Sequence, residues 1–323
     1  MRKSRLTFVF VLIMLFSLCS FSVNVAFAEE KIYLGGMPAG FIISTKGVEV
    51  VGVGDVVTED GVKCPAKDSG IEIGDIILKI DDHDTNSLSD VEMAINKQNS
   101  VVILIDRHDE KIIKNVEVVK DLSEKNRLGI FIKDTVSGIG TITYIKGNRF
   151  GSLGHAIVNE NGKIIETTGG NVYSCNITGY VKGERGKAGE LKGVFSRSNP
   201  IYKIEKNLDC GVYGSTVEVH DKLEEVKIGH AVPGDAQIVS TISGCIGQKY
   251  DISIIKVDQG QKTKNFVIKV NDKRLLDSTG GIVQGMSGSP ILQNGKLVGA
   301  VTHVFLNDPT RGFGIEIGNM LNN

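Results

Sequence analysis

The sequence predicts a mainly β fold with one small α+β part. Its 323 residues include 39 glycines and no tryptophan, a composition typical of many turns and short strands rather than long helices. Short β-branched segments, among them 140–145, 211–214 and 252–255, are separated by glycine, asparagine or aspartate. Because no long helical period is present beyond residue 121, we expect an antiparallel all-β sandwich or barrel there.

Length and charge limit the classes of function. The chain is long enough for about two domains of ordinary size. Hydrophobic residues make up 41% and charged residues 23%, as in a folded protein. The formal net charge of -1 gives no electrostatic reason to bind nucleic acid or an anionic membrane surface. We therefore expect no nucleic-acid partner.

The N-terminus has the pattern of a secretory signal peptide over residues 1–28. Arg2, Lys3 and Arg5 precede an apolar run that ends in Ala-Phe-Ala at 26–28. The run reaches roughly the 20 residues that span a bilayer, so an uncleaved membrane anchor is the alternative. In both cases the N-terminal segment contacts the membrane and the rest of the chain is exported.

The cysteines give no metal or cofactor signal. Four lie beyond the leader, widely scattered, with no CxxC pair and no histidine at zinc spacing. We expect neither a metal nor a cofactor. Export permits disulfides, but four cysteines allow three pairings, and unpaired thiols are an equal alternative. These cysteines are Cys64, Cys175, Cys210 and Cys245.

A small module of strands with one or two helices is expected over residues 47–120, after a linker at 29–46. Segments 48–53 and 71–80 are strand-like, and 89–97 has apolar residues at helical spacing. Ser87 or Ser89 is a candidate N-cap for that helix, because a serine oxygen accepts from an unpaired N–H of the first turn.

This module resembles a PDZ domain. The resemblance is carried by residues 65–70, by the run 73–81, which reads Ile-Gly-Asp-Ile-Ile-Leu-Lys-Ile-Asp, and by the helix. It implies binding of an extended peptide by strand addition, with a backbone-lined pocket for a terminal carboxylate. Residues 35–41 are a candidate for the carboxylate loop, and a flexible connection to the leader is the alternative.

The second domain, expected over 125–323 after a polar boundary at 120–128, contains the candidate nucleophile Ser287. It lies in Gly285-Met286-Ser287-Gly288-Ser289-Pro290, ahead of an Asn294-Gly295 hairpin signal. Glycines let the backbone turn tightly, so that a serine hydroxyl lies beside N–H groups able to stabilise an oxyanion. The run is similar to the G-D-S-G-G-P signature of chymotrypsin-like peptidases, with Met286 and Ser289 replacing the aspartate and second glycine. By analogy, the N–H groups of Gly285 and Ser287 form the oxyanion hole.

A serine nucleophile needs a base, and the sequence has six histidines. His155 is favoured, because it follows a glycine-rich turn early in the β domain. His230 and His303 remain alternatives. The other three are expected in exposed turns or charged stretches: His83, His108 and His220.

Taken together, these features resemble the stage IV sporulation protein B (SpoIVB) peptidase family of endospore-forming bacteria. The match is carried by the leader, the PDZ-like module, Gly154-His155, the run 279–290 and the run 299–309. It implies a chymotrypsin-like double-barrel serine endopeptidase, with His155 as general base and Ser287 as nucleophile.

The resemblance also implies Asp272 as the triad acid. It lies fifteen positions before the serine, whereas chymotrypsin-like chains place their acid much further away. Asp209, Asp235 and Asp277 therefore remain alternatives for orienting His155.

The family implies a biological role in sporulation. Members act between the forespore and mother-cell membranes, cleave themselves, and then cleave a membrane-bound regulator, so that a late sigma factor is activated. The PDZ-like module would hold substrate tails or restrain premature self-cleavage. Two other classes of function are a non-catalytic PDZ-containing adaptor with a degenerate peptidase fold and a small-substrate serine esterase. The esterase is disfavoured because this sequence lacks the usual Gly-x-Ser-x-Gly elbow between alternating strands and helices.

Overall fold

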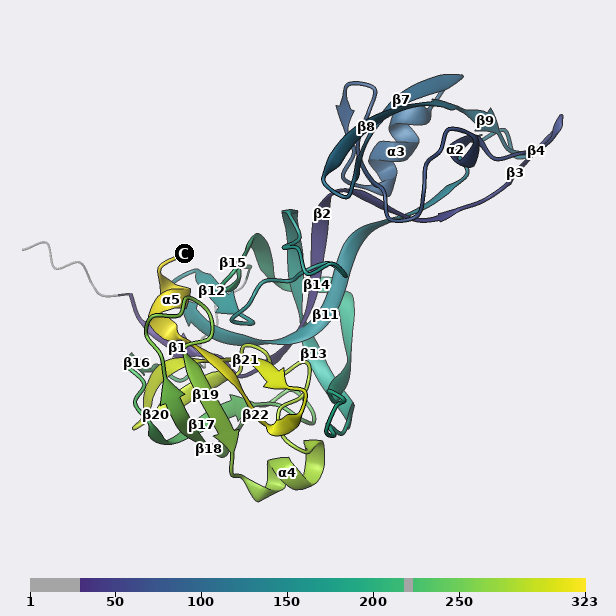
Figure 1. Cartoon of the computed structure of the whole chain (residues 1–323). Helices are drawn as coiled ribbons and strands as arrows, with labels where there is room; N and C mark the ends of the chain where they lie inside the picture. The colour runs from purple at the N-terminus through teal and green to yellow at the C-terminus, as the bar shows by residue number, and fades with distance from the viewer. Residues whose placement is uncertain (1–29, 218–222) are drawn as a thin grey trace, which may run out of the picture. The chain divides into compact units, whose positions relative to one another are not determined.

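The computed structural model describes residues 30–217 and 223–323 (Figure 1). The expected leader at 1–28 and His220 lie outside these residues. The chain divides into two units, 1–31 and 32–323, and the fold below is that of the second. Within the described ranges, no helix is long and apolar enough to span a bilayer.

The first barrel is a closed antiparallel sheet of six strands. It closes because β11 pairs with β12 on one side and with β2 on the other. Phe41, Ile142 and Tyr202 are among the residues of its core. A short strand, β1 (Ile32–Leu34), pairs with the end of β11. In ladder order the six strands are β11 (Ile130–Lys146), β12 (Arg149–Ser152), β15 (Gly211–Thr216), β14 (Glu190–Leu208), β13 (Thr167–Val181) and β2 (Pro38–Val53).

The second barrel is also closed, by pairing of β21 with β22. Tyr250, Phe266 and Ile291 pack in its core. Strand β16 (Lys227–Ile228) pairs parallel to β21, and two short helices follow β19 and β22: α4 (Lys273–Thr279) and α5 (Ile317–Leu321). In ladder order the six strands are β21 (Lys296–Phe305), β20 (Pro290–Gln293), β17 (Gly234–Ser240), β18 (Gln248–Val257), β19 (Phe266–Val270) and β22 (Asp308–Glu316).

The expected fold class, mainly β with a double barrel, is confirmed. The hairpin expected at Asn294-Gly295 is also present, between β20 and β21. Both residues have positive φ, 52° and 72°, as a two-residue turn that matches the twist of the strands requires.

The small module consists of short strands and two helices. Its core contains Ile77, Ile103 and Val116, and α3 contributes Val91 and Ile95. The oxygen of Ser87 caps α3 by accepting from the N–H of Asp90. Besides parts of β2 and β11, the module contains β3 (Val56–Thr58), β4 (Gly61–Lys63), α2 (Pro65–Asp68), β5 (Ile76–Ile80), β6 (His83–Asp84), α3 (Leu88–Ile95), β7 (Ser100–Arg107), β8 (Glu110–Glu117), β9 (Val119–Lys120) and β10 (Asn126–Arg127).

The module is inserted into the first barrel rather than placed ahead of it. Residues 38–45 are the first barrel strand, so the expected linker at 29–46 is wrong over this stretch. The same strand then enters the module, where residues 49–53 pair with 130–133 of β11. The expected boundary at 120–128 also shifts, because Leu128 is buried in the module core.

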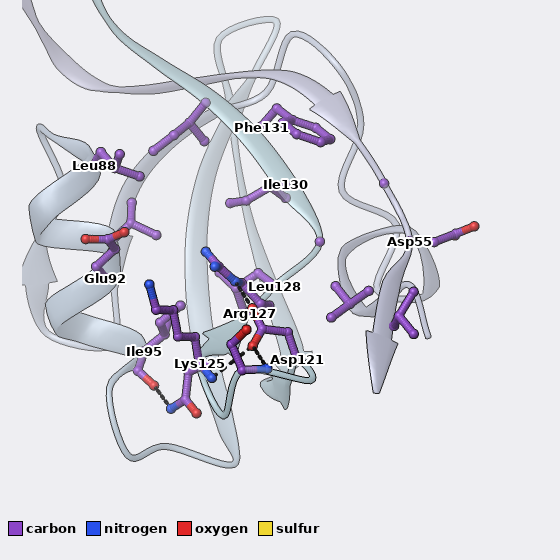
Figure 2. Close-up of a pocket in the computed structure, with 18 of the residues that line it drawn as sticks. Asp55, Leu88, Glu92, Ile95, Asp121, Lys125, Arg127, Leu128, Ile130 and Phe131 are labelled. Atoms are coloured by element: carbon purple, nitrogen blue, oxygen red, sulfur yellow. Dashed lines mark hydrogen bonds and ion pairs between the residues drawn. The ribbon is translucent and has the colours of Figure 1, made fainter. Parts of the chain in front are cut away.

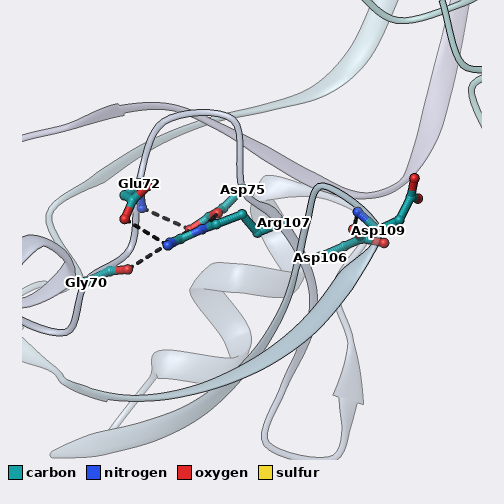
Figure 3. A network of polar contacts seen from close by, with 6 residues as sticks. All are labelled: Gly70, Glu72, Asp75, Asp106, Arg107 and Asp109. Atoms are coloured by element: carbon teal, nitrogen blue, oxygen red, sulfur yellow. Dashed lines mark hydrogen bonds and ion pairs between the residues drawn. The ribbon is translucent and has the colours of Figure 1, made fainter. Parts of the chain in front are cut away.

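A buried carboxylate ties one loop of the module to β7 (Figure 3). Asp75 is 1% exposed, and Arg107 donates to both of its oxygens, at 2.6 and 2.8 Å. Arg107 also donates to Glu72 and to the carbonyl of Gly70, both at 2.8 Å. Burial opposes ionisation, but these donors outweigh it and hold the pKa of Asp75 below its ordinary value.

Candidate active site

A cavity of about 390 Å³ is lined by residues of both barrels. Ser287, His155 and His303 all line it, although they come from three separate segments of the chain. No Asp, Glu, Lys or Arg is among its lining residues. The site is therefore uncharged when both histidines are neutral. Its apolar lining comes mainly from Val136, Ile139, Leu153, Ile157, Ala188, Ile282, Val283, Val304 and Leu306.

Strand β11 of the first barrel holds the loop that carries Ser287. The N–H of Thr141 donates to the carbonyl of Ser287 at 2.9 Å, and its hydroxyl donates to the carbonyl of Gly285 at 3.0 Å. The hydroxyl of Thr143 donates to the carbonyl of Gly288 at 2.8 Å. These contacts fix the nucleophile loop against the other barrel.

Gly288 is required by this close approach. Its φ is 91°, and a Cβ there would lie 2.1 Å from the carbonyl oxygen of Thr141 and 2.5 Å from the nitrogen of Leu153. A side chain would push the serine loop away from the segment that leads to His155. The glycine after the serine therefore brings the two halves of the site together.

Two backbone N–H groups of the loop are available to a ligand. Those of Gly285 and Ser287 donate to no group within the described ranges, and both residues line the cavity. The N–H groups of Met286 and Gly288, by contrast, donate to the carbonyls of Val283 and Val301. A pair of free donors beside a serine hydroxyl is the arrangement that stabilises a developing oxyanion.

His155 follows β12 after a tight turn. Leu153 has a φ of 65°, a conformation that bulky residues rarely adopt, and Gly154 has a φ of 70°. The Nδ1 atom of His155 lies 2.8 Å from the carbonyl oxygen of Ala156. Because a carbonyl only accepts, Nδ1 carries the proton and Nε2 is left as the base. Burial lowers the pKa of His155, so the ring is neutral near pH 7.

The hydroxyl of Ser287 points elsewhere in this conformation. Its Oγ donates to the carbonyl of Thr302 at 2.7 Å rather than to an imidazole nitrogen. The hydroxyl of Thr302 is itself buried and has no hydrogen-bond partner in the described part of the chain. Because the Ser287 hydroxyl is bonded to the Thr302 carbonyl, the Ser287 side chain must rotate about its Cα–Cβ bond before it can give its proton to His155.

His303, on β21, lies against His155. The two ring centroids are 4.7 Å apart, with the ring planes at 40°. His303 is an exposed residue by its solvent-accessible area. Its partial burial, His155 and Lys264 together lower its pKa to about 4.

The structure does not bring Asp272 to His155, contrary to the implied triad. Asp272 is the N-cap of α4, and its oxygens accept from the N–H of Arg274 at 2.9 Å, from the Arg274 guanidinium at 2.7 Å and from the N–H of Asp251 at 3.3 Å. These bonds, the Arg274 side chain first, lower its pKa to about 2. The carboxylate therefore caps the N-terminus of α4 and binds Arg274 rather than orienting His155.

The other candidate acids and bases also lie elsewhere. Asp209 pairs with Lys262, and His230 is exposed and binds Glu316 at 2.9 Å. Asp235 and Asp277 do not line the cavity either. Sequence reasoning missed Thr141 and Thr143 as supports of the serine loop, because nothing local marks a threonine that contacts another barrel.

A second cavity, a groove of about 720 Å³, lies in the small module between α3 and residues 126–132 (Figure 2). Val91 and Ile95 of α3 face it on one side, and Leu128 and Ile130 on the other. Residues 130–133 of β11 pair only with β2, so their second edge has no strand partner in the described chain. The groove therefore combines an apolar wall with an open strand edge.

One end of this groove has free donors. The N–H groups of Leu128 and Gly129 donate to no acceptor among the residues described. Gly129 has a φ of 75°, and a Cβ there would lie 2.6 Å from the carbonyl oxygen of Gly54. Arg127 pairs with Asp121 at 2.8 Å, whereas Lys125 has no ion-pair partner in the described chain (Figure 2). Adjacent N–H groups in such a turn form a site for an anion.

Residues 35–41, a candidate for the carboxylate loop with a flexible connection as the alternative, are neither, because they belong to the first barrel. Gly35 and Gly36 donate to carbonyls of β11, at 3.1 and 2.8 Å, and residues 38–41 lie in the first barrel. The free donors belong to 128–129 instead. A basic residue followed by a glycine between apolar residues, Arg127-Leu128-Gly129-Ile130, was the signal that could have located them.

The four cysteines of the described chain are all free thiols, with Cys175 and Cys210 buried. Across the described residues, no group of histidine, cysteine and acidic side chains is arranged to hold a metal ion.

Comparison with protein families identifies the family of this chain. Residues 124–321 match the family model described as SpoIVB peptidase S55. The matched range includes Ser287, His155 and the whole second barrel. A search of curated proteins finds no match to this chain.

Proposed function

The chain belongs to the SpoIVB peptidase S55 family of sporulation serine peptidases, and we propose that Ser287 and His155 are its nucleophile and general base. One observation carries the proposal. A serine hydroxyl, a neutral histidine and two unused N–H groups share one cavity at the junction of two barrels.

The proposed reaction begins when the Ser287 hydroxyl leaves the Thr302 carbonyl. Nε2 of His155 takes its proton while Oγ bonds to the carbonyl carbon of the scissile peptide. The N–H groups of Gly285 and Ser287 receive the resulting oxyanion. His155 then gives its proton to the leaving amine, the C–N bond breaks, and an acyl-enzyme forms. Water deprotonated by His155 cleaves the ester and restores the serine.

The test is Ser287→Ala. Loss of the nucleophile lowers kcat on a peptide substrate by about a million-fold, while circular dichroism is unchanged. A fluorophosphonate probe labels the wild-type protein and not the variant. An adaptor with a degenerate peptidase fold predicts the opposite, namely no turnover and no labelling of either protein.

We further propose that the natural substrates are this chain itself and a membrane-bound sporulation regulator. The family and the apolar N-terminal run support this, since an exported chain held near a membrane meets membrane-bound substrates. Cleavage of that regulator then leads to late sigma-factor activation. Mass spectrometry of N-termini tests self-cleavage: forms shortened near the N-terminus arise in wild type and not in Ser287→Ala.

For the small module we propose a PDZ-like role, the binding of an extended peptide that ends in a free carboxylate. The peptide adds a strand to the open edge of residues 130–133. Its carboxylate accepts from the N–H groups of Leu128 and Gly129, near Lys125. Its last side chain, an apolar one, enters the groove beside Val91 and Ile95.

Fluorescence anisotropy with a labelled peptide tests this role. In a Ser287→Ala background, which prevents cleavage, a peptide with a free apolar C-terminus binds. Its C-terminal amide binds at least ten-fold more weakly, because a charge-assisted bond is lost. Leu88→Glu, at a half-exposed wall position, weakens binding similarly. Equal binding of acid and amide would rule the role out.

A further inference from the structure

Among residues 30–217 and 223–323, no carboxylate is bonded to His155. The cavity lining contains no Asp or Glu, and Asp272 is bound to Arg274. A catalytic histidine nevertheless needs a fixed ring direction, because a 1 Å misplacement costs about 100-fold in rate. Some other group of this chain must restrain the ring.

Two contacts restrain it. At its edge, the Nδ1–H of His155 donates to the carbonyl of Ala156. This bond fixes the tautomer, but it is made to the adjacent residue and leaves the face of the ring unsupported. The ring of His303 packs against the ring of His155, with the centroids 4.7 Å apart and the planes tilted by 40°.

His303 is well placed to act as a support. It follows Thr302, whose carbonyl accepts from the Ser287 hydroxyl, in the same strand β21. The support and the acceptor of the nucleophile are therefore adjacent residues of one strand. Any shift of β21 would move both together.

We propose that His303 is a positioning residue, whose ring packs against His155 and holds it in the orientation that proton transfer from Ser287 requires. The carbonyl of Ala156 takes the place at Nδ1 that a carboxylate has in a Ser-His-Asp triad, and His303 adds a second restraint through its ring. The inference rests on the proposed roles of Ser287 and His155.

Charge favours this arrangement. The charged or titratable groups that act on His303 are His155 and Lys264, and both oppose its protonation. With a pKa of about 4, His303 is neutral when His155 accepts a proton. A neutral aromatic face beside a new imidazolium is attractive, whereas a second cation would oppose proton transfer.

Three variants of the full-length protein test the proposal with a peptide substrate. His303→Ala and His303→Gln remove the ring and lower kcat about 10- to 100-fold, with KM within about three-fold of wild type. His303→Phe keeps a ring and restores kcat to within about five-fold. Circular dichroism and thermal unfolding check that each variant is folded, as expected for a partly exposed side chain.

The pH profile separates positioning from a merely structural effect. Removing the ring admits water to His155 and reduces the burial that lowers its pKa, so the acidic limb of kcat/KM moves to higher pH in His303→Ala. In His303→Phe the limb stays in place.

Full activity of His303→Ala and His303→Gln, with an unmoved acidic limb, would overturn this inference and leave the proposed function intact. A loss in His303→Phe equal to that in His303→Ala would also overturn it. An inactive wild-type protein that no fluorophosphonate labels would overturn both proposals.

Discussion

The buried carboxylates and the proposed catalytic cavity of this protein differ in their electrostatics. Asp75 and Asp272 are nearly inaccessible, and each is bound by an arginine and by at least one backbone N–H group. The cavity around Ser287 has no charged side chain in its lining. Buried charge fixes a loop and a helix start, whereas the proposed site consists of neutral rings, a hydroxyl and backbone groups.

The strongest test of this contrast is His155→Gln. It removes the only proposed base, so kcat falls by about four to six orders of magnitude. Thermal unfolding is little changed, because His155 forms no ion pair with any residue that the structure describes. A steady-state peptide assay measures the loss. A loss below ten-fold would show that another group acts as base.

The wild-type pH profile belongs to the same test. A general base works when deprotonated, so activity falls as the pH drops through the pKa of His155. Burial lowers that pKa, so the acidic limb is expected below pH 6.5. A limb above pH 7 would contradict the neutral, desolvated site.

Arg107→Leu tests whether the buried charge of Asp75 stabilises the small module. It leaves the Asp75 carboxylate buried without its partner, which costs about 3–5 kcal/mol of unfolding free energy. Urea unfolding measures it. The matched control is Arg149→Leu, which breaks the exposed pair with Glu205 and costs less than about 1 kcal/mol. Equal costs would show that burial does not distinguish the two pairs.

Substrate charge is the next smaller effect. A charged residue beside the scissile bond must enter an uncharged, largely apolar cavity without a partner, so its kcat/KM falls about 10- to 100-fold relative to leucine. A peptide series with leucine, lysine or aspartate before the scissile bond measures this. A higher kcat/KM for the lysine or aspartate peptide would show that a charged group acts on the bound substrate, and would contradict the uncharged cavity.

Asp272→Asn has the smallest expected effect. It weakens the bonds to Arg274 and lowers the unfolding free energy by about 1–2 kcal/mol, while activity per folded molecule stays within about two-fold of wild type. Because the folded-state pKa is depressed to about 2, this stabilisation is present above about pH 4 and is lost as the pH falls toward 2.

The difference in stability between wild type and Asp272→Asn therefore shrinks over that range, as urea unfolding at several pH values can show. A hundred-fold loss of activity in a folded Asp272→Asn protein would show that Asp272 acts in catalysis as the triad acid.

Local patterns predicted the parts of the structure that local chemistry determines. The Asn294-Gly295 turn and the Ser87 cap both follow from residues within a few positions of each other. Ser287 and His155, selected on their glycine-rich surroundings, line one cavity.

The parts that the sequence did not predict depend on distant partners. Nothing near residues 38–45 shows that they pair with a strand almost a hundred positions later. Nothing near Asp272 indicates that Arg274, rather than a histidine, takes its carboxylate. The contact between His303 and His155 joins two barrels and leaves no periodic trace in either segment.

The insertion of the module between the first two strands of the barrel bears on how the chain folds. Pro38 pairs with Thr141, so closing this barrel hairpin from an unfolded chain would require a loop of about a hundred residues. Once the module has formed, Val53 already pairs with Ile130, and the remaining β2–β11 pairs can form one after another from that point. Folding of the module therefore removes most of the loop-closure entropy of pairing β2 with β11. It also places β11, whose Thr141 and Thr143 hold the loop of Ser287.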